Sequence, residues 1–445
     1  MSIGNKGIIS YHSSKNIKGG RYMRDKIRKI ALPVLMFAII LTIIIPGCTK
    51  ESSTPTSSAA PTTTAAPAKD KIVIGMSRPL SGWNATIGDS AFKPIYDKFK
   101  EKINAEGGIY IPQVGKKLPI EYLIYDDKSD MQLMTRNTEK LILEDKVDFL
   151  WPASGTAFLF AQAPIANKYN YVLITAEGGA TSLRDMLPSM PYVFISLSFA
   201  DWYEVPVLAD LLEAKGAKSA YIMYIADLHG IEYNGVAGIE FGKKGIDILG
   251  VKSVPPDIKD LSPIIKEAKA SGADAFLALA YPDQVMPAIG QSMELGYNPK
   301  LWLGGPGVNF GFFHTTFGPA VEGVCGWTTF ARKSSPELAA FADMLYEGLP
   351  EDANDWWGHP LYWGAYEFWK QAVEKVGWDQ KALMEMITTS HFNTILGDTY
   401  FTNGLMAKES HPGEVGQWIN GIFEVVGPED KATVPLVYPK PEWPK

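Results

Sequence analysis

Small hydroxyl and glycine residues follow several apolar runs of this chain, and such residues suit the binding of a small anion. Ser154, Gly155 and Thr156 come soon after the apolar run at 149–151 and before a helical segment. Hydroxyl groups and backbone N–H groups at the N-terminus of a helix form a cradle for an anion such as a carboxylate. The same residues can serve only as a helix cap, and capping is compatible with binding.

Acidic residues in two other loops are candidates for the opposite end of a ligand. Ala176, Glu177 and Thr181 follow the apolar run at 171–175, and Tyr281 and Asp283 follow the one at 275–280. Glu177 could meet a cationic group of the ligand, or it could be an ordinary acid that faces solvent. Both loops follow expected strands, which is where open α/β sheets bind their ligands.

Aromatic residues and one histidine stand in or near the expected loops. Trp83 follows the first apolar run, His229 lies in the loop after the run at 220–224, and Tyr362 belongs to the aromatic segment 356–363. Most of these rings are expected in the core or between lobes, and one or two in the wall of a pocket. We predict that Trp83 and Tyr362 flank the body of the ligand.

Signatures of catalysis and metal binding are missing from the sequence. It contains no Cys-x-x-Cys, no His-Glu-x-x-His, no Gly-x-Ser-x-Gly and no Gly-x-x-x-x-Gly-Lys-Ser/Thr. Asp126, Asp127 and Asp130 could hold a cation, although three acids at the end of a strand more often form a solvated turn. We expect a protein that is not an enzyme and that has no cofactor and no metal site.

The N-terminal segment has the layout of an export signal. A basic cluster from Arg24 to Lys29 precedes an uncharged run at 30–47, as in a secretory signal peptide. The run is also close to the length of a membrane-spanning helix, so a retained anchor is the alternative. The run ends in Ile45-Pro46-Gly47-Cys48, which resembles the bacterial lipobox, where the signal is cut before the cysteine and the thiol is lipidated. We expect a leader and signal peptide over 1–47 and lipidation at Cys48.

The chain beyond Cys48 fits a protein held outside the cell. Residues 48–70 are mostly Ser, Thr, Ala and Pro and predict a flexible linker to the lipid anchor. Lys and Arg outnumber Asp and Glu eight to one in residues 1–29, so the remainder is more acidic than the formal charge of −7. Such a charge argues against nucleic acid as a partner. Cys325 lies in an apolar run and is expected to be a buried, inert thiol.

The remainder of the chain, from Lys71 onward, alternates short apolar runs with segments of helical period. This alternation predicts parallel sheets covered by helices on both faces. About ten such units are too many for one open sheet, so we expect two doubly wound lobes. Two β-rich runs, Val415–Ile419 and Ile422–Val426, flank Asn420-Gly421 and predict a closing hairpin.

Several motifs in these elements resemble one family of binding proteins. The segment 103–109, Ile-Asn-Ala-Glu-Gly-Gly-Ile, closely matches the Ile-Asn-Ala-x-Gly-Gly-Ile signature of the type I periplasmic solute-binding proteins of the leucine/isoleucine/valine-binding kind. The opening 71–75 through 80–82 resembles that family's first strand and ligand loop. The segment 125–127 resembles the end of its second strand, and 420–428 resembles its closing hairpin.

The resemblance implies an architecture in which two lobes are joined by three crossings and the ligand is sealed between them. The expected N-lobe comprises 71–193 and 316–393, and the expected C-lobe comprises 194–315 and 394–445. Similar proteins work as monomers that pass a ligand to the permease subunits of an ABC transporter.

The resemblance also implies roles for individual residues. Ser154 and Thr156 match the hydroxyl loop that holds a carboxylate, and 176–181 falls in the loop after the fourth strand, which is longer here. Asp283 falls near the acid that pairs with a ligand amino group. His229 stands where a tyrosine is usual, and this exchange suits an aromatic acid or an amide as well as an amino acid.

We therefore predict an exported, lipid-anchored protein that captures an amino acid or a related small carboxylate or amide for an ABC transporter. It would lie on the outer face of the cytoplasmic membrane, at the cell surface or in the periplasm. A sensor that reports the same ligand to a signalling partner is one alternative. An exported hydrolase is another, since a fold does not by itself determine a function.

Overall fold

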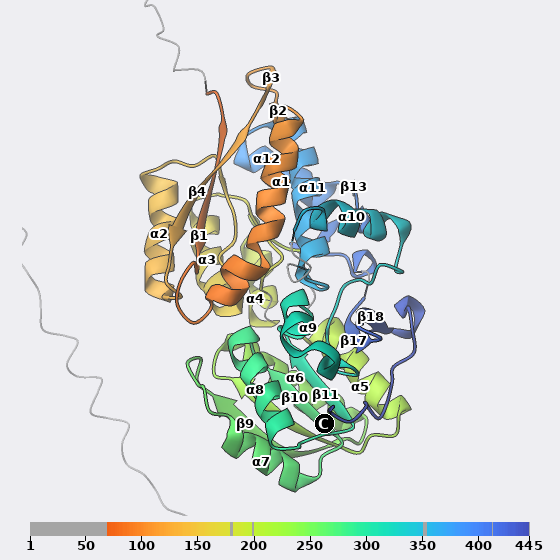
Figure 1. The fold of residues 1–445 in the computed structure, drawn as a ribbon. Coiled ribbons are helices and arrows are strands. Elements are labelled where there is room, and N and C mark those ends of the chain that lie inside the picture. Colours follow the sequence, from red (N-terminus) through yellow and green to blue (C-terminus); the bar gives the residue numbers. More distant parts are fainter. Residues whose placement is uncertain (1–68, 179–180, 198–199, 350–353, 412, 445) are drawn as a thin grey trace, which may run out of the picture. The chain divides into compact units, whose positions relative to one another are not determined.

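The structure is a computed structural model that describes residues 69–178, 181–197, 200–349, 354–411 and 413–444. The expected signal peptide (1–47), the lipidation site Cys48 and the linker up to residue 68 lie outside the described residues. The unit Ala65–Lys445 is compact and contains two seven-stranded sheets, each with helices packed on its faces (Figure 1). The two doubly wound lobes predicted from the sequence are thereby confirmed.

The first lobe is built on a sheet in the order β15-β16-β7-β6-β5-β1-β4. Neighbouring strands in it are parallel except for the antiparallel pair β15 and β16. Its strands are β1 (Ile72–Arg78), β4 (Ile120–Asp126), β5 (Phe149–Leu150), β6 (Leu173–Thr175), β7 (Val193–Ile195), β15 (Phe401–Thr402) and β16 (Leu405–Met406). Its helices are α1 (Lys93–Ala105), α2 (Met131–Leu143), α3 (Thr156–Lys168), α4 (Thr181–Met186), α10 (Pro336–Tyr346), α11 (Gly358–Val376) and α12 (Gln380–Thr389), with a short π-helix η1 (Thr86–Ala91). Two small hairpins, β2 (Ile109–Ile111) with β3 (Lys116–Leu118) and β13 (Phe392–Thr394) with β14 (Gly397–Thr399), complete it.

Helix α11 forms the centre of the first lobe and is buried over most of its length. The Tyr366 ring stacks on Phe99 of α1 with a centroid distance of 4.1 Å, and Trp151 lies 4.9 Å from Tyr366. These rings bury a large apolar area directly after β5, so they fix the point at which the loop before α3 begins. The aromatic segment 356–363 is largely core, as expected, because its three tryptophans are at most 5% exposed.

The second lobe is built on a sheet in the order β18-β17-β12-β11-β10-β8-β9. Its strands are β8 (Ser219–Ile225), β9 (Asp247–Val254), β10 (Ala275–Leu279), β11 (Leu301–Gly305), β12 (Cys325–Trp327), β17 (Val415–Ile419) and β18 (Ile422–Gly427). Its helices are α5 (Val205–Ala214), α6 (Leu228–Lys243), α7 (Ser262–Ser271), α8 (Pro282–Glu294) and α9 (Gly311–Phe317). The predicted closing hairpin is confirmed, because β17 and β18 pair antiparallel around Asn420-Gly421.

The chain passes between the two sheets three times, after β7, after β12 and after β16. The first passage follows β7, and the boundary predicted at 193/194 falls within this strand. The returns expected at 316 and 394 lie too early: β12 still pairs with β11 in the second sheet, and β16 still pairs with β7 in the first. These strands have only two or three residues, which is too short for a periodic signal, and distant partners determine their place.

The acidic segment after β4 forms a capped turn. Asp130 caps α2 by accepting a hydrogen bond from Leu133 N at 2.6 Å, and Asp126 accepts one from Lys128 N at 2.8 Å. Asp127 is buried beside them. No group of three or more His, Cys, Asp or Glu side chains within the described ranges could hold a metal ion. The backbone turn therefore accounts for these acids.

None of the helices in the part of the chain that the structure describes is both long and apolar enough to span a membrane.

Candidate functional site

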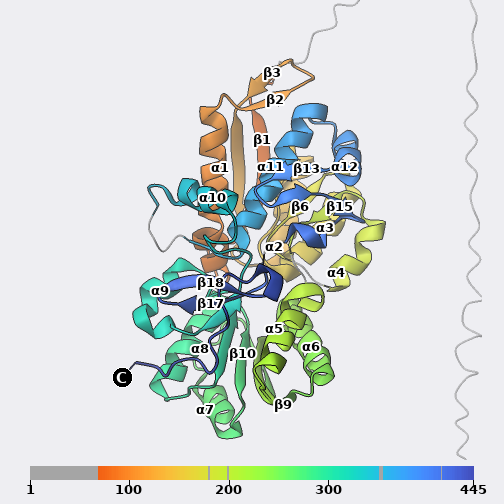
Figure 2. The ribbon, with the colours of Figure 1, turned by 90° about the vertical axis from the view of Figure 1, so that its right-hand side faces the viewer.

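The carboxyl ends of the two parallel sheets face each other across the boundary between the lobes (Figures 1 and 2). The loop after β1 meets the loop after β10 there, where the Trp83 ring lies 5.9 Å from the Tyr281 ring. The loop after β5 meets the same tyrosine, because Thr156 N lies 3.4 Å from the Tyr281 hydroxyl oxygen. Three residues that the sequence placed in the site, from segments far apart, are thus brought together.

The hydroxyl loop, which comprises Ser154, Gly155 and Thr156, leads into helix α3. Its central residue has a backbone conformation that only glycine adopts readily. Gly155 is the N-cap residue with φ +95° and ψ 148°, so no side chain caps the helix. Ser154 is 1% exposed, and its Oγ has no hydrogen-bond partner within the described chain. The N–H of Thr156 donates to Tyr281 Oη, and no N-cap side chain binds the N–H groups that follow it. These N–H groups and the buried Ser154 hydroxyl can together hold an anionic ligand.

Asn84 supports the hydroxyl loop from the side. Its Nδ2 donates a hydrogen bond of 3.2 Å to Ser154 O, and the residue is 1% exposed. Its Oδ1 has no partner in the described residues. No pattern in the sequence distinguished Asn84, although it directly follows Trp83.

Aromatic rings form the side of the site that belongs to the second lobe. The Tyr281 ring stacks on the His229 ring with centroids 5.0 Å apart. The Tyr233 ring also contacts the His229 ring, with centroids 4.4 Å apart. His229 Nε2 lies 3.4 Å from Gly305 O. Burial lowers the pKa of His229, so the ring is neutral at pH 7 and serves as an aromatic surface. Together with Trp83, these rings suit a flat, apolar ligand body.

Glu177 has a different role from both of those considered for it. Its carboxylate forms a fully buried ion pair with Arg78 and also accepts a hydrogen bond from the Tyr362 hydroxyl. It is therefore not an acid facing solvent: Oε1 receives both contacts, and Oε2 is buried without a partner in the described residues. Tyr362 correspondingly belongs to the core of the first lobe, where its ring lies 5.4 Å from Phe92.

Arg78 connects the loops of the first lobe from beneath. Its guanidinium donates to Pro152 O at 3.0 Å and to Gly88 O at 3.1 Å, in addition to Glu177. These acceptors lie in the loop after β5, in η1 after β1 and in the loop after β6, so a single buried cation holds all three segments in position. Ala176, which directly precedes Glu177 in the loop after β6, is buried and only 1% exposed. The only sign of this role in the sequence is that Arg78 ends an otherwise apolar strand, which is too weak a pattern to select it.

Asp283 and Thr181 make contacts between the lobes. Asp283 Oδ1 in α8 accepts a hydrogen bond of 3.1 Å from Thr86 Oγ1 in η1. Burial raises the pKa of Asp283, while the Thr86 hydroxyl acts to lower it. Thr181 N, at the start of α4, donates to the carboxylate of Glu232 in α6. Both predicted residues lie at the boundary of the lobes. The Asp283 carboxylate has a protein partner there, whereas Thr181 is bound through its backbone N–H and its Oγ1 is buried without a partner in the described residues.

A buried carboxylate, Glu204, ends the first crossing next to these residues. It accepts hydrogen bonds from Tyr233 Oη and, at 3.1 Å, from Trp357 Nε1. Desolvation raises the pKa of Glu204 to about 7, although both hydrogen bonds act to lower it. Tyr233 thus links the crossing to His229 in the site.

Cys325 is fully buried in β12, and burial raises the pKa of its thiol to about 12. The expected burial of the thiol is confirmed, and a raised pKa disfavours the reactive thiolate at neutral pH.

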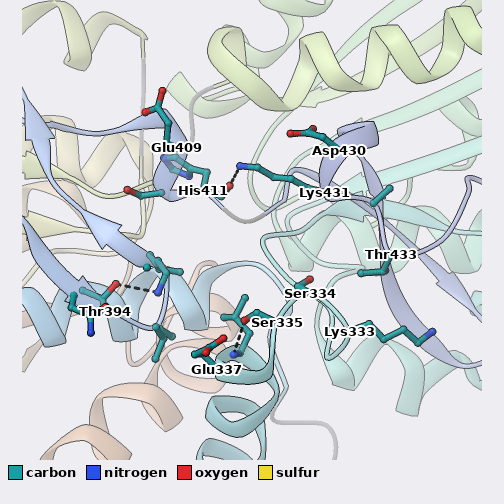
Figure 3. A pocket seen from close by; sticks show the side chains of 17 residues that line it. Lys333, Ser334, Ser335, Glu337, Thr394, Glu409, His411, Asp430, Lys431 and Thr433 are labelled. Atoms are coloured by element: carbon teal, nitrogen blue, oxygen red, sulfur yellow. Dashed lines mark hydrogen bonds between the residues drawn. The ribbon is translucent and has the colours of Figure 1, made fainter.

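A separate pocket of about 640 Å³ lies at the second and third crossings, away from the residues described above (Figure 3). Its lining carries both signs of charge, from Lys333 and Lys431 and from Glu337, Glu409 and Asp430. Lys431 Nζ donates to the backbone oxygen of His411 within it. The pocket contains none of the residues selected from the sequence, and its mixed charge favours no particular ligand.

Known proteins resemble this chain over most of its length. A family model described as periplasmic binding protein matches residues 71–421. The Leu/Ile/Val-binding protein homolog 7 of Brucella suis is 24% identical over 86% of this chain and 98% of its own length. A solute-binding protein of an ABC transporter from R. palustris, solved in complex with benzoate, has a TM-score of 0.68 at 18% identity and covers 82% of this chain and 97% of its own. The branched-chain amino acid transporter substrate-binding protein of Streptococcus pneumoniae, solved with isoleucine, has a TM-score of 0.68 at 18% identity and covers 83% and 100%.

Proposed function

The chain belongs to the periplasmic binding protein family, whose model matches residues 71–421, and on this premise we propose that it captures a small carboxylate for an ABC transporter. Its relatives include proteins of ABC transporters solved with benzoate and with isoleucine. The family implies a location outside the cytoplasm. The basic cluster, the apolar run and Cys48 support export and lipid anchoring. On the same premise, the protein delivers its ligand to the permease subunits of the transporter. We propose that it does so as a monomer and that it is not an enzyme.

The hydroxyl loop is the proposed receptor for the ligand carboxylate. The observation that carries this proposal is the Ser154 hydroxyl, which is buried without a protein partner beside the N-terminus of α3. A charged oxygen would accept hydrogen bonds from Ser154 Oγ and from the backbone N–H groups of the first helical turn. The helix dipole favours negative charge at the same point. Tyr281 Oη lies 3.4 Å from Thr156 N and can donate to the same carboxylate.

The body of the ligand would lie against Trp83, Tyr281 and His229. These rings offer an apolar surface, and burial keeps His229 uncharged. Of the acids expected to meet a ligand ammonium group, Glu177 has its charge balanced by Arg78, and Asp283 accepts a hydrogen bond from Thr86. These contacts favour an aromatic carboxylate over an amino acid within the proposed class of small carboxylates.

Capture would require the lobes to open and close around the ligand. The loops that hold it come from both lobes, so the closed arrangement makes contacts that the open one lacks. A ligand shifts this equilibrium by its difference in affinity for the two arrangements. Closure also removes water from the ligand, which strengthens the hydrogen bonds at the hydroxyl loop.

Thermal melting of the purified protein against benzoate, 4-hydroxybenzoate, leucine and isoleucine tests the proposal. A ligand at a hundred times its dissociation constant adds about 2.7 kcal/mol of stability, which is a shift of a few degrees. Ser154→Ala should weaken binding roughly ten- to hundredfold, because it removes one hydrogen bond to a charged group. Ser189→Ala is the control, since Ser189 is exposed and its hydroxyl bonds only to Met186 O.

The contrary results are equally definite. Full binding by Ser154→Ala would show that the carboxylate lies elsewhere. Ligand carried over from the cells is first removed by unfolding and refolding the protein. If no compound then shifts the melting temperature, the capture of these carboxylates is rejected, and hydrolase assays become the next test. If the protein binds the ligand but cells take up the labelled ligand equally well with and without the gene, the sensor alternative would be favoured.

A further inference from the structure

Two carboxylates of the second lobe reach the first lobe beside the hydroxyl loop. The first is Glu232 in α6, which takes the place of a capping residue for helix α4 of the other lobe. Its carboxylate accepts hydrogen bonds from Thr181 N, from Ser182 N at 3.2 Å and from Ser182 Oγ at 2.5 Å. The helix N-terminus carries partial positive charge, so an acid is the favoured partner at this end.

The second carboxylate belongs to Asp283, in the first turn of α8. It accepts the hydrogen bond of Thr86 Oγ1 at 3.1 Å, and both residues are half-buried. Thr86 begins η1, the segment that follows the loop after β1.

The order of the strands places these two contacts on either side of the hydroxyl loop. In the first sheet β5 lies between β6 and β1, and the hydroxyl loop follows β5. Helix α4 follows β6 and η1 follows β1, so Glu232 is bound on one flank and Asp283 on the other. Neither contact can persist when the lobes separate, because each joins an element of one lobe to an element of the other.

We propose that Glu232 and Asp283 are latches that stabilise the closed arrangement of the lobes and do not themselves contact the ligand. This inference rests on the proposed function, and it assigns to Asp283 a role different from the ligand contact suggested by the sequence. Among the described residues, Thr181 takes part through its backbone N–H alone, which leaves its hydroxyl free for a ligand. The latches act on the fraction of molecules that is closed, and the apparent affinity of every ligand depends on that fraction in the same way. Weakening a latch therefore lowers all affinities by one common factor.

A side chain that touches the ligand behaves differently. If Asp283 paired with a ligand ammonium group, Asp283→Asn would weaken isoleucine and leave benzoate unchanged. If Glu232 met the ligand body, its removal would change the order of affinities. The ratio of affinities among ligands is thus the measurement that separates a latch from a ligand contact.

The experiment measures the affinities of benzoate, 4-hydroxybenzoate and isoleucine for a set of variants by calorimetry. Glu232→Ala should weaken each ligand that binds by about tenfold, in keeping with the loss of hydrogen bonds to a charged group. Asp283→Asn should weaken each by a smaller common factor. Glu240→Ala is the matched control, because Glu240 lies on the same helix and pairs only with Lys243 of that helix. Ser182→Ala combined with Glu232→Ala should cost less than the product of the two single losses.

Small-angle X-ray scattering of the ligand-free protein provides a readout that does not depend on the ligand. The variant with both Glu232→Ala and Asp283→Asn should have a larger radius of gyration than the wild type, and Glu240→Ala should equal the wild type. An unchanged radius, or a changed order of ligand affinities, would overturn the latches. If none of the compounds binds the wild type, the proposed function fails for these ligands, and the scattering comparison still decides on the latches.

Discussion

The isosteric substitution Glu204→Gln should remove a pH dependence from the stability of the protein. Glu204 is fully buried at the end of the first crossing, and desolvation raises its pKa from 4.5 to about 7. Glutamine keeps both hydrogen bonds, because its Oε1 can accept from Trp357 Nε1 and its Nε2 can donate to Tyr233 Oη. The substitution therefore changes the charge and leaves the packing intact.

The sign and the size follow from proton linkage. The folded state holds the Glu204 proton more tightly than the unfolded state, so this residue's contribution to stability is complete below about pH 4.5 and is lost as the pH rises through about 7. Between pH 5 and pH 8 the loss amounts to about 2–3 kcal/mol, since each pKa unit is worth about 1.4 kcal/mol. The wild type should thus lose about this much relative to Glu204→Gln across the range.

Urea unfolding of both proteins at pH 5, 6, 7 and 8 measures the effect. Other titrating groups are common to both proteins and cancel in the difference between their free energies of unfolding. Parallel curves for the two proteins would refute the reasoning, because Glu204 would then be ionised in the folded protein over the whole range. A wild type that gains stability relative to the variant as the pH rises would reverse the sign and reject a desolvated carboxylate.

Two further outcomes are expected from other buried positions. Gly155→Ala should lower both stability and ligand affinity, because φ +95° costs of order 1–3 kcal/mol for alanine and its Cβ would lie 3.3 Å from Asn84 Nδ2; Gly115→Ala, at φ +65° with nothing within 4 Å, should leave affinity unchanged in the same titrations. Cys325 should react with a thiol reagent at pH 8 only in denaturant, because burial raises its pKa to about 12, and reaction at the rate of a free thiol in the native protein would contradict its burial.

The sequence alone determined the features that depend on local pattern. Alternating apolar runs and helical segments predicted two doubly wound lobes, and the Asn-Gly turn predicted the hairpin of β17 and β18. The hydroxyl loop at 154–156 could be selected because its residue types and the helix behind it are adjacent in the chain. The burial of Cys325 followed from its apolar neighbours. Each of these inferences needs only a few consecutive residues, whose spacing reflects the helix or strand that they form.

The tertiary structure alone decided which partner each polar side chain meets. Glu177 is paired with Arg78, 99 residues earlier, and with Tyr362, 185 residues later, so its charge is balanced inside the first lobe and it does not face solvent. Asp283 and Thr86 are 197 residues apart, and only the packing of one lobe against the other joins them. A carboxylate in a loop can bind a ligand, cap a helix or pair with an arginine. Its choice depends on the strand order and on desolvation at the meeting of distant segments, which no local pattern records.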